Sequence, residues 1–87
     1  MSYTIKWRPE AVKELRKLPK EIAERVVKRV DIAKEKPKHF LEKLVDDPGY
    51  KVRIGDYRAI IDIIEDERVI AVRFVGHRKN IYKRHLE

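Results

Sequence analysis

Residues 50–64, YKVRIGDYRAIIDII, predict a β-hairpin by themselves. Apolar and polar residues alternate along them, as they do in a strand that buries one face. Gly55 and Asp56 suit a two-residue loop, because glycine in the first central position favours a type II′ turn. The register that follows pairs Ile54 with Tyr57, Arg53 with Arg58, and Lys51 with Ile60.

The predicted hairpin gathers three positive charges on one face of the sheet. Side chains alternate across a sheet, so Lys51, Arg53 and Arg58 share a side. Like charges directly opposite one another destabilise a strand pair. A small domain that accepts this cost is expected to use the cations to bind an anion. The opposite face carries Tyr50, Val52, Ile54, Tyr57, Ala59, Ile61 and Ile63.

The rest of the chain predicts an α+β fold of order β-α-α-β-β-β-(α), in one domain at residues 1–87. Residues 3–7 alternate like a first strand, and Pro9 suits the first position of a helix. Apolar residues at helical spacing continue through a longer helix that follows Pro19 and stops near Lys36-Pro37. We therefore expect a twisted, mainly antiparallel sheet with a two-helix hairpin packed on one face.

A third strand of the meander is predicted at Val69 to Val75, after a turn at residues 65–68. A loop of two or four residues gives the same pairing parity, which places Arg73 on the cationic face. Asp62 lies diagonal to Arg73 there and can neutralise part of the charge. The basic segment after Gly76 predicts a short helix. On the same parity, the core face gains Ile70, Val72 and Phe74.

The composition favours an acidic partner. Twenty-two Lys and Arg against fifteen Asp and Glu give a formal net charge of +7 in 87 residues, with a pI near 9.8. Such a balance is typical of proteins that bind nucleic acid or an acidic protein. There is no cysteine, and His39, His77 and His85 are too scattered for a structural zinc site, so we expect no metal and no cofactor. No membrane span or signal peptide is recognisable, which predicts a cytoplasmic location without membrane contact.

The cationic face suits phosphate chemistry. Arginine binds phosphate bidentately, and lysine supplies a point charge. Such a group can hold an RNA backbone and stabilise the negative charge that develops when a phosphodiester is attacked. Metal-free RNA cleavage also needs a base for the 2′-hydroxyl and an acid for the 5′-oxygen. Tyr82 can act as the base if Arg53 and Arg78 lie beside it, because neighbouring cations lower the pKa of a tyrosine.

Two tracts of the sequence match a known family. The first is Tyr50-Lys51-Val52-Arg53 followed by Tyr57-Arg58, and the second is Val75-Gly76-His77-Arg78-Lys79-Asn80-Ile81-Tyr82. They resemble the RelE/ParE superfamily of toxins from toxin–antitoxin systems. The opening strand, the Pro9 helix and the long second helix fit as well, so the resemblance covers nearly the whole chain.

The resemblance implies a small ribonuclease. RelE-type toxins enter the ribosomal A site and cut messenger RNA there without a metal, using the 2′-hydroxyl as nucleophile and leaving a cyclic phosphate. A cognate antitoxin blocks the toxin, so the expected partners are an antitoxin, the ribosome and messenger RNA. Carried over by position, the catalytic residues are Lys51, Arg53, Arg58, Arg78 and Tyr82. Contacts to RNA are expected from Arg73, His77, Lys79 and Lys83.

The resemblance also divides the catalytic roles. Lys51 and Arg53 correspond to cations that stabilise the phosphate, and Arg58 to an arginine that braces the transition state. Arg78 matches the arginine proposed as general acid, while Tyr82 matches a tyrosine proposed as base or as a stacking platform. The family often has lysine where this chain has Arg53, and Tyr82 sits closer to Arg78 than in the best-known bacterial arrangement. The choice of general base therefore stays open, and His77 can share acid–base duty.

Other functions stay open at this point. ParE-type relatives share the fold but poison DNA gyrase by binding, without catalysis. A decayed toxin that only binds antitoxin or RNA is a further alternative. For Arg73 there is also a structural alternative, in which its one role is to form an ion pair with Asp62. The combination of Lys51, Arg53, Arg58 and Arg78 favours the ribonuclease, because ParE-type members usually lack it.

Overall fold

The computed structural model describes the backbone of residues 2–85 and the side chains of residues 2–81. The predicted α+β order is confirmed, with short additional elements around residues 37–43 and 65–67. In chain order the elements are β1 (Thr4–Trp7), α1 (Pro9–Lys17), α2 (Lys20–Ala33), α3 (Pro37–Phe40), β2 (Glu42–Lys43), β3 (Tyr50–Ile54), β4 (Tyr57–Ile64), the 3₁₀ turn η1 (Glu65–Glu67), β5 (Val69–His77) and α4 (Arg78–His85).

Prolines set the boundaries of the helices. Pro9 occupies the first turn of α1, where the missing N–H would have no intrahelical partner in any case. Pro19 takes the N-cap position of α2 and so separates the two main helices. Pro37 begins α3, and α2 already ends at Ala33, slightly before the expected boundary. The two main helices thus begin at the prolines that the sequence indicated.

Five strands form one mixed sheet in the order β1-β5-β4-β3-β2. β1 runs parallel to β5, and all other neighbours are antiparallel. Gly55 has a φ of 59° and Asp56 does not have a positive φ, as the predicted turn requires. The β3–β4 register is the predicted one and pairs Ile54 with Tyr57, Arg53 with Arg58, and Lys51 with Ile60.

The pairing of β4 with β5 departs from the expected parity. Ile61 pairs with Val72 and Ile60 pairs with Phe74, which leaves Arg73 as an extra residue in β5. This is a β-bulge, in which two residues of one strand oppose a single residue of its neighbour. The alternation of side chains is therefore reversed beyond Arg73.

The bulge changes which residues of β5 point toward the main apolar core, which lies on the face of the sheet covered by α1 and α2. Ile70 and Val72 lie there as predicted, but the placement of Phe74 on that face was wrong. Phe74 packs instead against Ile60 on the other face, and Val75 takes the core position. The error came from counting parity through a strand that contains one inserted residue.

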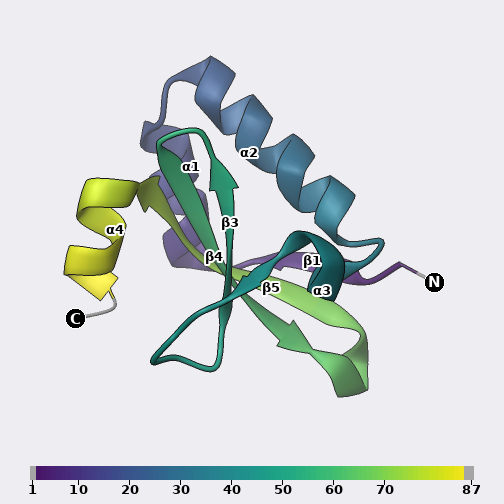
Figure 1. Ribbon diagram of the computed structural model, residues 1–87. Coiled ribbons are helices and arrows are strands. Elements are labelled where there is room, and N and C mark those ends of the chain that lie inside the picture. Colours follow the sequence, from purple (N-terminus) through teal and green to yellow (C-terminus); the bar gives the residue numbers. More distant parts are fainter. Residues whose placement is uncertain (1, 86–87) are drawn as a thin grey trace.

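The two main helices cover one face of the sheet. The core there is formed by Ala11 of α1 and by Val26, Val30 and Ala33 of α2, packed on apolar residues of β3, β4 and β5. Figure 1 shows α1 and α2 on the same side of the strands. Burial of this apolar surface supplies the main stabilisation of the fold. Trp7, Tyr50 and Tyr57 pack against the cluster, as expected.

The other face of the sheet is partly covered by α4. Ile81 of α4 packs there with Leu44, Ile60 and Phe74 in a second, smaller apolar cluster. Figure 1 shows α4, in yellow, directly beyond the end of β5. This contact fixes the start of α4 beside the face that carries the cations. Across the described residues, the helices are all too short or too polar to cross a membrane.

Candidate functional site

Five cations from three elements line one open pocket of about 380 Å³, called the cation pocket below. β3 supplies Lys51 and Arg53, β4 supplies Arg58, and α4 supplies Arg78 and Lys79. Four of the five residues predicted to be catalytic are therefore brought together. The hairpin register accounts for three of them, and the contact of α4 with the second apolar cluster brings the fourth.

The β3–β4 turn holds Arg58 in place. Its Nη1 donates hydrogen bonds to the carbonyl oxygens of Gly55, at 2.7 Å, and Tyr57, at 2.8 Å. Gly55 is needed in this turn because its φ of 59° is one that residues with a Cβ rarely adopt. The same turn that sets the strand register therefore also orients an arginine of the pocket.

The turn also anchors the beginning of α4. The backbone N–H of Arg78 donates to the carbonyl oxygen of Asp56 at 2.8 Å. The Arg78 Nε lies 3.7 Å from Oδ1 of the same residue. Both side chains are largely exposed, at 54% for Arg78 and 69% for Asp56. An exposed pair of this kind adds little to stability, so its main effect is on the local charge.

A second carboxylate approaches the pocket from the edge strand β2. Glu42 is the cross-strand partner of Lys51, and its Oε1 lies 3.7 Å from Nε of Arg53. Both side chains of the Arg53–Glu42 pair are more than half exposed. Neither Glu42 nor Asp56 was predicted from the sequence to lie at this site. Asp56 was visible in the turn itself, whereas Glu42 depends on β2, a two-residue strand that no periodicity predicts.

Arg73 lies outside the cation pocket, in an ion-pair network. Its guanidinium contacts Asp47, with Nη2 2.6 Å from Oδ1, and Asp62, with Nε 3.2 Å from Oδ1. All three side chains are at least 73% buried, since their exposed fractions are 20%, 24% and 27%. The expected pairing with Asp62 is confirmed. This placement favours the structural alternative for Arg73 over direct contact with RNA.

The same network ties down the loop before β3. Asp47 accepts a hydrogen bond from Arg73 and one from the backbone N–H of Gly49, at 2.7 Å. The Arg73 hydrogen bond, and after it the Gly49 one, holds the pKa of Asp47 below its ordinary value, against an opposing effect of burial. Asp47 therefore loses its proton more readily in the folded protein than an ordinary aspartate does.

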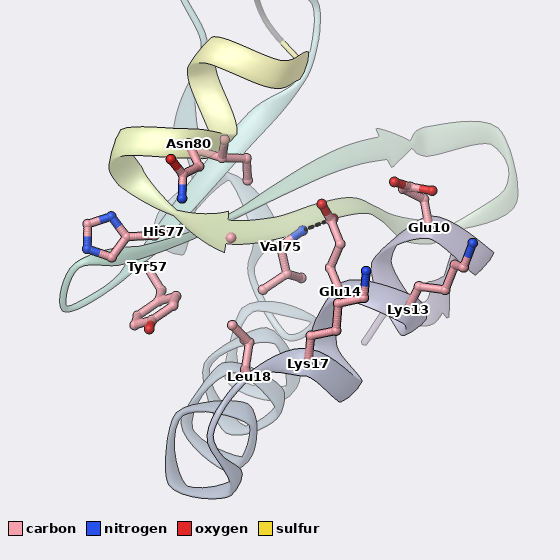
Figure 2. Close-up of a pocket in the computed structure, with 11 residues that line it drawn as sticks. Glu10, Lys13, Glu14, Lys17, Leu18, Tyr57, Val75, His77 and Asn80 are labelled. Carbon is pink, nitrogen blue, oxygen red and sulfur yellow. Dashed lines mark hydrogen bonds between the residues drawn. The ribbon is translucent and has the colours of Figure 1, made fainter.

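His77 lies in a different concavity, between α1, β5 and α4. This pocket of about 460 Å³ is lined on one side by Glu10, Lys13, Glu14 and Lys17, and on the other by Tyr57, His77 and Asn80. Figure 2 shows the Tyr57 and His77 side chains together, across from those of α1. The Tyr57 and His77 rings meet edge to face, with 5.4 Å between their centroids. The His77 Nδ1 accepts a hydrogen bond from the Lys79 N–H at 3.2 Å.

The remaining predicted residues cannot be placed in the same detail. Lys79 lines the cation pocket beside Arg78, and its contact with RNA stays a prediction. Tyr82 and Lys83 fall in α4, but their side chains lie outside the described residues. Among the residues that the structure describes, no group of His, Asp or Glu side chains is arranged to hold a metal ion. The five cations of the cation pocket can bind an anion and stabilise its charge.

The sequence matches a known family over most of its length. Residues 5–82 match the profile described as the ParE toxin of the type II toxin–antitoxin system parDE. The chain belongs to this toxin family. The resemblance to the RelE/ParE superfamily that the Lys51–Arg53 and Arg78 tracts indicated is thereby confirmed.

Relatives of this toxin carry RelE names. It is 31% identical over 83 residues to a protein of Escherichia coli described as a RelE-like toxin, an alignment that covers 91% of this chain and 86% of the relative. The free-state structure of a mutant Escherichia coli toxin RelE superposes with a TM-score of 0.81 at 27% identity, covering 99% of this chain and 96% of that one. The α+β architecture of the toxin is therefore that of RelE.

One similar structure is a toxin–antitoxin complex. The complex RelBE2 of Mycobacterium tuberculosis contains a chain that superposes with a TM-score of 0.82 at 25% identity. The superposition covers 90% of this chain and 100% of that one. A toxin with the fold described above can therefore be held by an antitoxin.

Proposed function

We propose that this toxin is a ribosome-dependent endoribonuclease that cleaves messenger RNA in the A site. Its chemistry is metal-free attack of the 2′-hydroxyl on the adjacent phosphate, and it is neutralised by a cognate antitoxin in the cytoplasm. The observation that supports this most directly is the convergence of Lys51, Arg53, Arg58 and Arg78 on one pocket. Four side chains of one charge, in an open concavity, suit a phosphodiester whose negative charge increases in the transition state.

In the proposed reaction each cation has its own part. Lys51, Arg53 and Arg58 surround the position of the scissile phosphate and stabilise the pentavalent phosphorane. Arg58 is held in place, because its guanidinium donates hydrogen bonds to the carbonyl oxygens of Gly55 and Tyr57. Fixed donors contribute most to catalysis, since they need no reorganisation when the charge develops. Arg78, on the neighbouring helix, faces the leaving 5′-oxygen.

The base that accepts the 2′-hydroxyl proton is assigned to Tyr82. It lies one helical turn after Arg78, and residues four apart share a face of an α-helix. Nearby arginines favour the phenolate form of a tyrosine. His77 is the less suitable candidate for the base. It lines the separate pocket between α1, β5 and α4 and does not line the cation pocket.

An antitoxin partner is part of the proposal. The fold matches the toxin in the complex RelBE2, and the net charge of +7 favours an acidic partner segment. We expect a small acidic protein to be encoded next to this toxin. The cation pocket is a natural target for its carboxylates, because five cations line it.

A second function has one specific observation in its favour. The profile that matches residues 5–82 is that of ParE, and ParE-type toxins poison DNA gyrase without catalysis. The cation pocket argues against this alternative, since gyrase poisoning needs no group that stabilises a phosphorane. Purified toxin added to a translation extract and, separately, to a gyrase supercoiling reaction distinguishes the two. New messenger 5′ ends with unchanged supercoiling support the ribonuclease, and trapped gyrase–DNA complexes with intact message refute it.

A further inference from the structure

Two arginines of the cation pocket are partly neutralised by carboxylates of the same chain. Arg53 is paired with Glu42 of β2, and Arg78 with Asp56 of the β3–β4 turn, each at 3.7 Å. The carboxylates approach from different elements, the edge strand and the turn. Both pairs lie on an open surface where they add little to folding stability. Their presence at this pocket therefore calls for a role other than stability.

We propose that Glu42 and Asp56 act as built-in competitors for phosphate, which weaken the binding of loose RNA and restrict tight binding to a substrate held in place by the ribosome. The inference rests on the proposed function and names what sets its selectivity. A phosphate that engages Arg53 or Arg78 must displace a carboxylate or accept it as a negatively charged neighbour. Either way the binding of an unpositioned nucleic acid is penalised.

The separations determine how large the penalty is. Each carboxylate lies 3.7 Å from the Nε of a guanidinium that would bind phosphate, which is an ion-pair distance beyond hydrogen-bonding range. Two like charges about 4 to 5 Å apart in water repel enough to change a binding constant about fivefold. Two such groups at one pocket make a penalty of about tenfold or more at low salt. When the ribosome holds the messenger in place, its own contacts with the message offset this unfavourable contribution to binding.

The alternative role for these carboxylates is to position the arginines. Positioning and competition predict opposite signs for the same substitution. If Glu42 and Asp56 mainly orient Arg53 and Arg78, neutral amides weaken phosphate binding. If they compete with phosphate, neutral amides strengthen it. Competition is favoured because 3.7 Å from Nε is long for a hydrogen bond and both pairs are more than half exposed.

The test measures binding of a labelled, single-stranded 2′-O-methyl RNA hexamer, which cannot be cleaved because its 2′ oxygens are blocked. The variants are E42Q, D56N and the double substitution. We expect each single change to tighten binding about threefold to fivefold at low salt, and the double change about tenfold. The slope of log affinity against log salt should steepen by up to about 0.7 for each arginine released. Melting temperatures should not change.

Matched controls carry the same charge change away from the pocket. Asp66→Asn alters the η1 turn, which follows the other end of β4, and Glu24→Gln alters α2 on the opposite face of the sheet. Equal tightening in these controls would reduce the effect to net charge and overturn the proposal. Unchanged or weaker binding by E42Q and D56N would overturn it as well.

One further variant separates this inference from the proposed function. The double substitution of Arg53 and Arg78 to alanine should weaken hexamer binding at least tenfold relative to the parent protein. If it does so while E42Q and D56N leave binding unchanged, only the competitor role fails. If it has no effect, the cation pocket does not bind RNA, and the proposed ribonuclease fails together with the inference.

Discussion

Arg53 and Arg58 stand directly opposite each other in the β3–β4 ladder, so that two positive charges form one cross-strand pair. Such a pair costs stability, and the chain compensates only locally. Glu42 lies near Arg53, and two backbone carbonyl oxygens accept hydrogen bonds from Arg58. We infer that the pair is kept for what it binds, which makes stability and activity change in opposite directions on substitution.

Replacement of Arg53 by threonine tests this opposition. The free energy of unfolding should stay equal or rise by up to about 1 kcal/mol, because a like-charge pair is removed and threonine suits an exposed strand position. Ribosome-dependent cleavage should fall by at least about tenfold. Denaturant unfolding and a cleavage assay measure the two effects on one preparation.

The control for this change is Lys6→Thr. Lys6 is also exposed in a strand, but its cross-strand partner is Ala71, which carries no charge. This variant should keep both stability and activity close to those of the parent protein. A clear fall in the unfolding free energy of Arg53→Thr, alongside its loss of cleavage activity, would contradict our account of the pair.

Arg73 is predicted to matter for folding. Arg73→Met removes the guanidinium between Asp47 and Asp62, so that Asp47 loses this cation and Asp62 keeps Arg8, whose Nη2 lies 3.7 Å from its Oδ2. The expected loss is about 2 to 3 kcal/mol of unfolding free energy. Lys at this position should lose less, since it keeps the charge but not the two-pronged geometry. If the remaining folded protein cleaves message far less well than the parent, Arg73 contacts the substrate after all.

The Asp47–Arg73 bond should make part of the stability depend on pH. The pKa of Asp47 is lowered in the folded state, first by the Arg73 hydrogen bond. The folded protein therefore binds fewer protons here than the unfolded chain, whose aspartates titrate near pH 4, so acid favours unfolding. The stability difference between the parent protein and Asp47→Asn should be constant above about pH 5 and shrink as the pH falls below about 4.

Chemical denaturation at a series of pH values checks this prediction. Asp66→Asn is the matched control, since Asp66 is exposed and its difference from the parent protein should hardly vary with pH. A stability difference for Asp47→Asn that grows toward low pH would mean that the sign of the linkage is wrong.

Glu14 is predicted to stabilise the edge of the sheet, where its carboxylate accepts a hydrogen bond from a backbone N–H of β5. β1 pairs with β5 only as far as Val72, and beyond it the Val75 N–H donates to the Glu14 carboxylate at 2.9 Å (Figure 2). Glu14→Ala should cost about 1 to 2 kcal/mol, because it leaves a partly buried backbone donor without this acceptor. Glu10→Ala, one turn earlier in α1 and lining the same pocket, should cost less than about 0.5 kcal/mol. Equal costs for both would contradict the role assigned to Glu14.

The hairpin and its cations were predictable because their signals are local. Gly55 sets the turn, alternation sets the faces, and the register then places Arg53 opposite Arg58 without any knowledge of the rest of the fold. The Arg73 bulge was not predictable in this way. Pairing parity counts residues and assumes a regular strand, whereas the inserted residue is stabilised by Asp47 and Asp62, which are distant in sequence.

Glu42 marks a similar limit on what the sequence alone can indicate. It reaches the cation pocket only because two residues of β2 pair with the start of β3. A strand that short carries no periodicity. Asp56 could have been noticed, since a turn that orients Arg58 also places its own side chain next to the following element.

The most direct test of the central claim is induced expression in growing cells, with messenger 5′ ends mapped for the parent toxin and Arg78→Ala side by side. The account predicts new ends within translated reading frames for the parent toxin, and a reduction of at least about a hundredfold in Arg78→Ala. Growth arrest by both proteins without new messenger ends would contradict the account.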